Sequence, residues 1–511
     1  MHHFKSVALA AAFALAATPI RASAPEEAVA AAKDWRASNG AEIVAEFASL
    51  LAAQNVAGGG MEVERNVKTI VHAYAQRGFQ MKRFEAEDAS PLIYGAKDYP
   101  GAVRTIAIYA HYDGQPVNEA DWTNPPFKPT LYTRAIDDGG EIIPLPGHGE
   151  AIDDDWRLYA RSAGDDKAPI IALIAALDAL EAKGMTPSVN IRLVFDGEEE
   201  AGSPNLGKYL TDNEALFSDI DLWLFCDGPK HQSGRSQLVF GARGVTDMGI
   251  TVYGPNRGLH SGHYGNWAPG PGWRLVNLLA SMKDDEGRVL IRDFYKGTKP
   301  VTAADRRAIA AMPPVDDALR AEFGLAETEM KDALLAERIL LPALNLKGLK
   351  SAEVGEKARN VIPPTATASI GVRLAAGNDP DVMLDRIENH IKREGYFIVR
   401  DEPDQAVRLA HPLIAKVTRH GGYPAVRSRL DDPAIAPLTA ALKKAAPDLI
   451  LTPTLGGSLP LFLFTEVSDA PIVILPIANF DDNQHAADEN IRLGDFFGGV
   501  EAYAAALVMD E

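Results

Sequence analysis

The stretch RTIAIYA, residues 104–110, decides the fold that the sequence predicts. It is apolar from Ile106 to Ala110 and runs directly into His111-Tyr112-Asp113. Three further runs have the same character: NIRLVF at 190–195, DLWLFC at 221–226 and PIVILP at 471–476. Runs that are apolar on both faces are typical of strands in a parallel sheet with helices on both sides. Ala168–Gly184 has the composition of such a helix, so we predict an α/β fold with a mainly parallel sheet.

Polar side chains of the metal-binding type follow each of these runs. They are His111 after the first, Glu198-Glu199-Glu200 after the second, Asp227 after the third and His485 nine residues beyond the fourth, with Asp165 at the start of a helix. Because ligands bind at the carboxyl ends of strands in such sheets, we expect these side chains to meet at one edge. Two imidazoles with three or more carboxylates suit zinc first, with manganese or cobalt as alternatives.

The excess of carboxylates favours two metal ions bridged by one aspartate, and it leaves one glutamate free to act as a base. Asp113 stands two residues after His111, where its carboxylate can hold the other nitrogen of that ring. Each motif alone is common on protein surfaces and at helix starts. Their joint position after buried strands is what indicates a site.

The chain from Gly244 to about residue 400 has a different pattern. Strands are expected at Thr246–Tyr253, Thr365–Leu374 and Tyr396–Arg400, helices at Gly272–Lys283 and Asp379–Gly395, and a charged helical excursion at 284–346. This order predicts a small α+β domain with antiparallel pairing. We therefore expect an inserted domain at 244–400 and a larger domain made of 25–243 and 401–511.

The net charge of −19, from 51 basic and 70 acidic residues, argues against a nucleic-acid partner or an anionic membrane. Cys226 is the one cysteine, so no intrachain disulfide can form. Because Cys226 ends a buried strand, we interpret it as a core thiol rather than a nucleophile.

The N-terminus has the pattern of a cleaved signal peptide. Lys5 precedes an apolar run from Val7 to Ala17, and Ala22-Ser23-Ala24 is similar to a cleavage site. The run is too short to cross a bilayer, and a buried core helix is the alternative. On this interpretation residues 1–24 are removed, and we expect a secreted or periplasmic protein.

Several motifs occur in an order that resembles one known family. They are His111-Tyr112-Asp113, Asp165-Asp166-Lys167, Glu199-Glu200-Ala201-Gly202-Ser203, Asp227, Phe240-Gly241-Ala242-Arg243-Gly244, Leu259-His260-Ser261-Gly262, Arg373, Gly456-Gly457-Ser458-Leu459-Pro460 and His485 with Glu489. The pattern resembles the di-zinc exopeptidases and amidohydrolases that include carnosinase, cytosolic non-specific dipeptidase, aminoacylase and succinyl-diaminopimelate desuccinylase. The carnosinase-like dipeptidase branch is the most similar. The resemblance implies a zinc-peptidase catalytic domain with an inserted ferredoxin-like domain that acts as a lid and forms a homodimer.

The resemblance also implies a role for each matching residue. His111 and Asp227 would bind one zinc ion, Glu200 and His485 the other, and Asp165 would bridge both. Glu199 would be the general base, with Asp113 beside His111, and Glu198 would have no role.

The remaining roles concern the substrate. His260 of the partner subunit would stabilise the oxyanion, and Arg373 would bind the substrate carboxylate with help from Gly457 and Ser458. The alternative for His260 is a turn residue without a role in catalysis, and the alternative for Arg373 is a charge at a strand edge.

These observations predict a zinc-dependent dipeptidase or carboxypeptidase that cleaves an amide bond next to a free carboxylate. An N-acyl-amino-acid amidohydrolase is the alternative, because Leu455 stands where the carnosinase branch has a glutamate. A small peptide or an N-acyl amino acid is thus the expected substrate. A non-catalytic metal-binding relative is the third possibility, which the complete set of ligands and the base disfavours.

Overall fold

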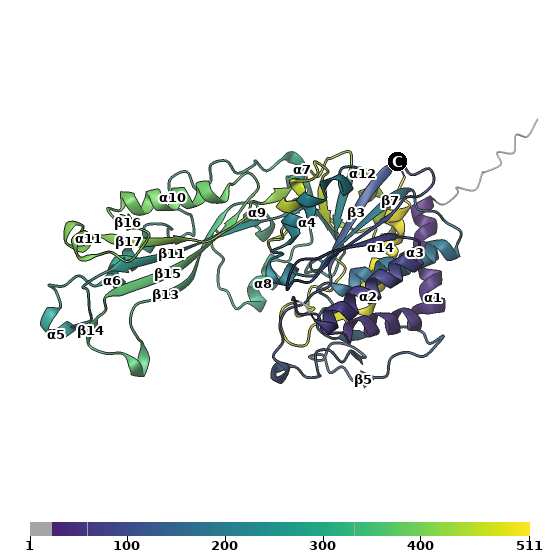
Figure 1. Cartoon of the computed structure of the whole chain (residues 1–511), viewed down its shortest axis with the longest axis horizontal. Helices are drawn as coiled ribbons and strands as arrows, with labels where there is room; N and C mark the ends of the chain where they lie inside the picture. Colours follow the sequence, from purple (N-terminus) through teal and green to yellow (C-terminus); the bar gives the residue numbers. More distant parts are fainter. Residues whose placement is uncertain (1–22, 59, 332, 511) are drawn as a thin grey trace, which may run out of the picture.

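The computed structural model describes residues 23–58, 60–331 and 333–510. The chain forms two domains, one built around an eight-stranded sheet and one around a five-stranded sheet that projects from it (Figure 1). No helix in the described ranges is both long and apolar enough to cross a membrane.

The four predicted apolar runs form the centre of the eight-stranded sheet, as β3 (Arg104–His111), β7 (Val189–Asp196), β8 (Leu222–Phe225) and β20 (Ile472–Ile474). β7, β3, β8 and β20 lie side by side in this order, and all three contacts between them are parallel. The prediction of a mainly parallel α/β sheet is therefore confirmed. The outer strands are β1 (Gln80–Phe84), β2 (Leu92–Lys97), β9 (Gln237–Val239) and β19 (Ile450–Thr452).

Helices cover both faces of this sheet, which explains why its central strands are apolar throughout. On one face, Ile106 and Ile108 of β3 belong to the same buried cluster as four of the longer helices and α12. These are α1 (Ala24–Leu51), α2 (Met61–Gln76), α3 (Lys167–Ala182), α12 (Ala436–Ala445) and α14 (Leu493–Leu507). On the other face, Ala107 and Tyr109 pack with residues of the short helices α4 (Leu206–Asp212) and α13 (Phe462–Thr465).

Three strands of the long connection between His111 and Asp165 form a smaller sheet with β21. The strands are β4 (Thr130–Tyr132), β5 (Ile142–Ile143), β6 (Arg157–Tyr159) and β21 (Asn490–Arg492), in the order β21-β6-β4-β5. Because β21 follows His485 closely in the chain, its pairing with β6 brings the segment that carries His485 next to the one that carries Asp165.

The inserted domain has the βαββαβ order of a ferredoxin-like fold. Its sheet runs β13-β15-β11-β17-β16, with all contacts antiparallel except that between β16 and β17. The elements are β11 (Gly244–Tyr253), α6 (Pro271–Ala280), β13 (Ala343–Lys350), β15 (Thr365–Leu374), α10 (Pro380–Arg393), β16 (Phe397–Val399) and β17 (Ile414–Arg419). Leu275 and Leu278 of α6 and Ile387 of α10 bury one face of this sheet. The α+β prediction for this domain is confirmed.

Two details differ from the sequence-based expectation. The sheet continues past residue 400, because β17 pairs with β11 after the short helix α11 (Gln405–Ala410). β13 begins inside the stretch expected to be wholly helical, which contains α7 (Ala303–Ala310), α8 (Asp316–Glu322) and α9 (Leu335–Arg338). β13 is exposed along most of its length, so its sequence lacks the apolar pattern of a buried strand.

The remaining short elements are two pairs of two-residue strands and several single turns. β10 (Gly241–Ala242) pairs with β18 (Val426–Arg427), and β12 (Leu259–His260) pairs with β14 (Val361–Ile362). α5 (Ser261–Tyr264) follows β12 directly, and 3-10 turns occur at Glu119–Asp121, Glu199–Ala201, Glu214–Leu216 and Gly355–Lys357.

Candidate metal centre

The predicted metal ligands come together at the carboxyl ends of the parallel strands. His111 ends β3, Asp227 follows β8, Glu200 lies in the turn after β7, and Asp165 precedes α3. Two groups of ligand atoms lie within 4.8 Å of one another: His111, Asp165 and Asp227 form one, and Asp165, Glu200 and His485 form the other. Asp165 belongs to both groups, as a bridging carboxylate would.

Asp165 is the centre of this arrangement. Its Oδ1 lies 2.8 Å from His111 Nε2, and its Oδ2 lies 3.1 Å from His485 Nε2. The same His485 nitrogen lies 3.1 Å from Glu200 Oε2. His111 and Asp165 are buried, whereas the His485 side chain is 54% exposed, so one group is deep and the other opens to solvent.

The charges of the cluster show that its residues fit metal ions. Burial and the neighbouring Asp165 raise the pKa of Asp227 to about 7. Burial raises the pKa of Glu199 as well, although His111 opposes this, whereas hydrogen bonds to Asp165 and Glu200 raise the pKa of His485 to about 10. Buried carboxylates this close together repel one another and need protons or cations. Divalent cations with nitrogen and oxygen ligands meet that need without protonation.

Asp113 holds two parts of the site in place. Its Oδ1 lies 3.3 Å from His111 Nδ1, where it can fix the orientation of the ring. The backbone N–H groups of Glu199 and Glu200 donate to its two carboxylate oxygens, at 3.1 and 3.0 Å. Asp113 therefore joins the end of β3 to the turn that carries the glutamates.

Glu489 has a supporting position that the sequence did not reveal, although it belongs to the His485 motif. Its carboxylate accepts hydrogen bonds from the backbone N–H groups of Ser162, Gly164 and Asp165 and from the Arg161 guanidinium. Burial and Asp165 raise the pKa of Glu489 to about 7. These contacts fix the turn that presents Asp165.

Gln115 and Gln484 also contact the cluster and were missed. Gln115 Nε2 donates to Glu200 at 2.8 Å, and Gln484 Nε2 donates to Asp165 Oδ2 at 2.7 Å. Gln484 precedes His485, which is the one sequence signal that could have identified it. His485 has a backbone φ of 63°, an uncommon conformation for a residue with a side chain, which is typical of functional sites.

The predicted carboxylate-binding residues also lie together. Arg373 Nη1 donates to Ser458 Oγ at 2.6 Å, and the backbone N–H of Arg243 donates to the Gly457 carbonyl at 3.1 Å. Tyr423 interacts electrostatically with both groups: burial and Glu199 raise its pKa to about 12, whereas Arg373 opposes the shift.

His260 lies elsewhere in the chain. It is exposed, and its Nδ1 accepts a hydrogen bond from the backbone N–H of Gly262 at 3.1 Å, so it caps α5. Figure 1 places α5 at the end of the inserted domain that is farthest from the eight-stranded sheet. One copy of the chain therefore does not bring His260 to its own metal cluster.

Solved structures share this arrangement of domains. The M20 family metallo-carboxypeptidase of Sulfolobus solfataricus superposes with a TM-score of 0.72 at 23% identity, covering 91% of this chain and 98% of that one. Human carnosine dipeptidase 1 superposes with a TM-score of 0.66 at 21% identity, covering 94% of this chain and 99% of that one. Both likenesses concern the fold.

Curated relatives match most of the chain. The Cys-Gly metallodipeptidase of Saccharomyces cerevisiae is 25% identical over 425 residues, 82% of this chain and 81% of the relative. The cysteinylglycine-S-conjugate dipeptidase of Corynebacterium striatum is 26% identical over 435 residues, 84% of this chain and 86% of the relative. The human Beta-Ala-His dipeptidase is 25% identical over 417 residues, 78% of this chain and 74% of the relative.

The prediction of a secreted or periplasmic protein is corrected by these matches. The yeast Cys-Gly metallodipeptidases and the human Beta-Ala-His dipeptidase that match the chain contradict an assignment to the exported proteins. The predicted signal peptide falls almost wholly on residues 1–22, outside the described residues. An apolar run behind a single lysine is a signal of composition alone, which explains how it misled the prediction.

The sequence profile of peptidase family M20/M25/M40 matches residues 107–509, and this range contains every residue of the candidate metal centre. The chain therefore belongs to this family and is a metallopeptidase.

Proposed function

We propose that this metallopeptidase is a dipeptidase with two zinc ions in each subunit, and that it cleaves an amide bond next to a free carboxylate. The observation that carries the proposal is the pair of ligand groups that share Asp165, next to a separate Arg373–Ser458 pair. The dipeptidase names of the matched relatives support the same class of substrate.

The residues around the cluster divide the chemistry between them. His111 and Asp227 would hold one zinc ion, Glu200 and His485 the other, and Asp165 both. Bound zinc supplies a Lewis acid and lowers the pKa of water. The Arg373 guanidinium and Ser458 Oγ bind the carboxylate of the substrate, which fixes the position of the amide.

Glu199 is the base in this proposal. Its raised pKa suits a group that takes a proton from the attacking water and passes it to the leaving amine. Asp113 holds its backbone through the Glu199 N–H, so the carboxylate is aimed by the same residue that orients His111.

The proposal includes a homodimer, because His260 would act in the site of a second copy. The inserted domain has the surface for such contact: Trp267 and Trp273 are 80% and 78% exposed, and β13 has a neighbouring strand on one side alone within the described residues. A histidine donor that meets the developing oxyanion typically lowers the barrier by about 3 kcal/mol.

The substrate class is tested with the zinc-loaded protein on a pool of dipeptides and on the same pool after N-acetylation, with products identified by mass spectrometry. Cleavage of the free dipeptides is expected, and Glu199→Gln is the inactive control. Cleavage of the acetylated pool alone would replace the dipeptidase by an N-acyl-amino-acid amidohydrolase, the function that Leu455 favours.

The dimer is tested by mixing two inactive variants, His260→Ala and Glu199→Gln. A mixed dimer contains one site with both residues intact, so activity should return on mixing. No recovery, although the two variants exchange subunits, would remove His260 from the mechanism.

A further inference from the structure

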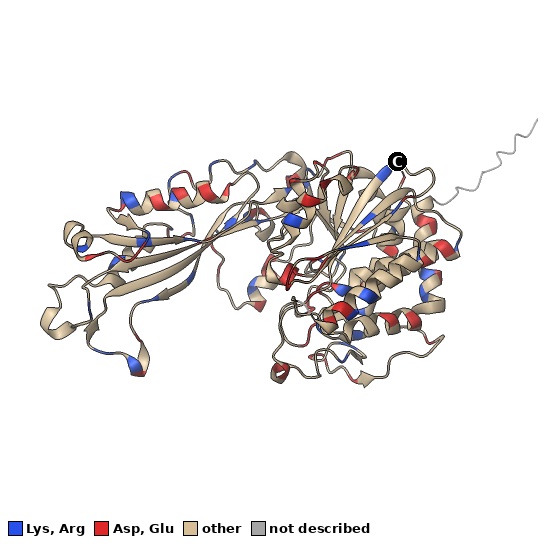
Figure 2. Cartoon of the chain, viewed as in Figure 1, with Lys and Arg blue, Asp and Glu red and all other residues tan. Residues whose placement is uncertain are grey.

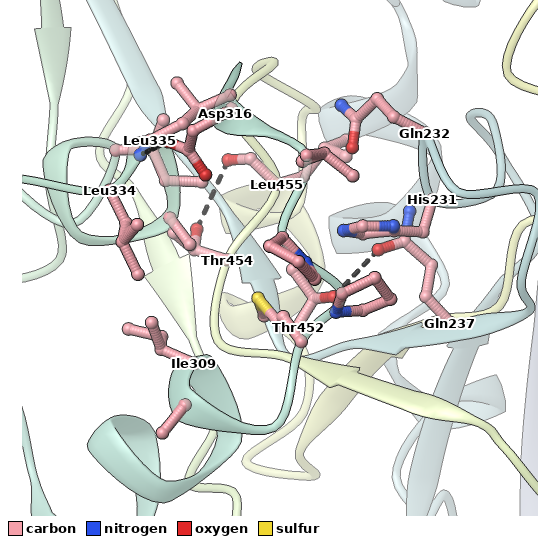
Figure 3. A pocket seen from close by; sticks show the side chains of 18 residues that line it. His231, Gln232, Gln237, Ile309, Asp316, Leu334, Leu335, Thr452, Thr454 and Leu455 are labelled. Carbon is pink, nitrogen blue, oxygen red and sulfur yellow. Dashed lines mark hydrogen bonds between the residues drawn. The ribbon is translucent and has the colours of Figure 1, made fainter. Parts of the chain in front are cut away.

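A cavity of about 290 Å³ lies between the two domains, lined by residues of both (Figure 3). One wall belongs to the part of the inserted domain that runs from α7 to the end of α9, through Ile309, Met312, Leu334 and Ile339. The other wall belongs to the catalytic domain, through Gln237, Thr452 and Leu455. Its volume is close to the lower end of small-molecule pockets.

Apolar side chains make up most of the lining, and several of its polar groups are already hydrogen-bonded within the protein. Thr452 Oγ1 donates to Gln237 Oε1 at 2.7 Å, and Gln237 Nε2 donates to the Pro229 carbonyl at 3.0 Å. Burial lowers the pKa of His231, which keeps its ring neutral. The described lining residues include no lysine or arginine, and their one carboxylate, Asp316, accepts a hydrogen bond from the Leu335 N–H at 2.7 Å, so the cavity does not suit a carboxylate ligand.

Leu455 joins the cavity to the metal centre. It lines the cavity, and its Cδ2 lies 3.9 Å from the position that a Cβ on Gly228 would occupy, directly after Asp227. It also precedes the Gly456–Ser458 loop that meets Arg373. Ile339 packs over this loop, with its Cγ2 3.6 Å from a Cβ position on Gly456.

Two leucines remain exposed at the cavity, although they are large and apolar. Leu334 and Leu335 are 43% and 44% exposed, and both line it. Exposed apolar side chains around a concave site are typical of a surface that binds a ligand.

We propose that this cavity binds the apolar group on the amino side of the scissile amide, either an apolar side chain or an acyl chain. The inference rests on the proposed function, in which the carboxylate of the substrate lies at Arg373 and Ser458. A substrate held there has its other end directed away from Arg373. Leu455 lies beside the turn after Asp227 and also lines the cavity, whose described lining residues include no lysine or arginine. Because Leu334 and Leu455 line the cavity, their side chains determine which apolar group of the substrate is preferred at this position.

The test compares three amides of leucine: glycyl-leucine, phenylalanyl-leucine and N-hexanoyl-leucine. The wild type should have a higher kcat/KM on at least one of the two apolar substrates than on glycyl-leucine. Leu334→Glu should lower kcat/KM on the preferred apolar substrate by about tenfold and leave kcat/KM on glycyl-leucine unchanged. A tenfold loss is the size expected when an apolar contact of one or two methylene groups is removed. Whichever apolar substrate responds identifies the group as a side chain or an acyl chain.

Leu325→Glu is the matched control, because Leu325 is 48% exposed in the same segment and does not line the cavity. It should leave all three values unchanged, and circular dichroism should show both variants folded. An equal loss on all three substrates for Leu334→Glu, no loss on any, or no apolar preference in the wild type would overturn the inference alone. Failure of the wild type to hydrolyse any of the three would overturn the proposed function as well.

Discussion

Buried carboxylates in the two domains are neutralised in different ways. In the inserted domain, Glu388 of α10 is 4% exposed and accepts hydrogen bonds from Arg400 at 2.8 and 2.9 Å and from Arg419 at 2.7 Å. Burial alone would raise the pKa of Glu388, but the two arginines outweigh it and hold that pKa at about 2. Figure 2 shows that α10 carries charges of both signs along its length.

At the edge of the catalytic sheet, none of the described arginines plays this part for Asp227 or Glu199. The pKa of Asp227 is raised to about 7, mainly by burial and by Asp165, and burial also raises the pKa of Glu199. In the inserted domain two arginines of the chain neutralise Glu388, whereas the carboxylates at the sheet edge need metal ions from solution. A buried carboxylate that is paired with arginines has a structural role. Several buried carboxylates that are grouped with histidines indicate a metal site.

The largest effect is expected from Glu199→Gln, which removes the proposed base and keeps the proposed ligands. Turnover should fall by about 100- to 10,000-fold, the usual contribution of a general base. Steady-state kinetics measure this loss, and elemental analysis should find the metal content unchanged. Loss of metal together with activity would make Glu199 a ligand instead.

Removal of metal should destabilise the protein through the catalytic domain. With a chelator, the free energy of unfolding should fall by about 3 kcal/mol, the stabilisation given by a ligand at a hundredfold excess over its dissociation constant. Denaturant titration with and without added zinc measures the difference. If chelation lowers the free energy of unfolding of Glu388→Gln by the same amount, the Glu388 cluster and the metal centre are independent. If chelation does not lower the stability of the wild type, the carboxylates at the sheet edge do not depend on metal ions.

A smaller effect is expected from Glu388→Gln, which leaves two arginines without their carboxylate. The free energy of unfolding at neutral pH should fall by about 2 kcal/mol, the range for hydrogen bonds to charged groups, while kcat stays unchanged. Glu394→Gln, exposed at the end of the same helix, is the matched control. Equal stability of the two variants would mean that the arginines contribute nothing to the fold.

The contribution of Glu388 to stability depends on pH, and the sign of this dependence follows from its pKa. The pKa of Glu388 is about 2 in the folded protein, below the value of about 4.3 for an unfolded chain. Its contribution is therefore fully present above the unfolded pKa and is lost as the pH falls through about 2. The difference in stability between wild type and Glu388→Gln should narrow over that range, as measured by denaturant titration at several pH values.

The central strands and the metal-type residues could be predicted because local sequence carries both signals. Ile106–Ala110 is apolar on both faces, and a ligand residue follows each such run within nine residues. The helix expected at Asp379–Gly395 matches α10, and Asp379 caps its first turn by accepting from the Val382 N–H.

Contacts made between distant segments could not be predicted in this way. Glu489 and Gln115 reach the cluster from turns whose position depends on β6, β21 and the path of the chain after β3. The cavity joins Ile309 and Leu334 to Leu455, across more than a hundred residues of chain. β17 follows the helix α11 in the chain and belongs to the inserted sheet because it pairs with β11. The local sequence pattern does not reveal this pairing.

The central claim is that the carboxylate cluster at the sheet edge holds two metal ions through a shared Asp165. Elemental analysis of the purified protein, loaded with zinc and freed of excess metal, tests it directly. The account predicts two zinc ions per chain in the wild type and fewer in Asp165→Asn, with two retained in Glu388→Gln. One zinc ion or none in the folded wild type, or two in folded Asp165→Asn, would contradict it.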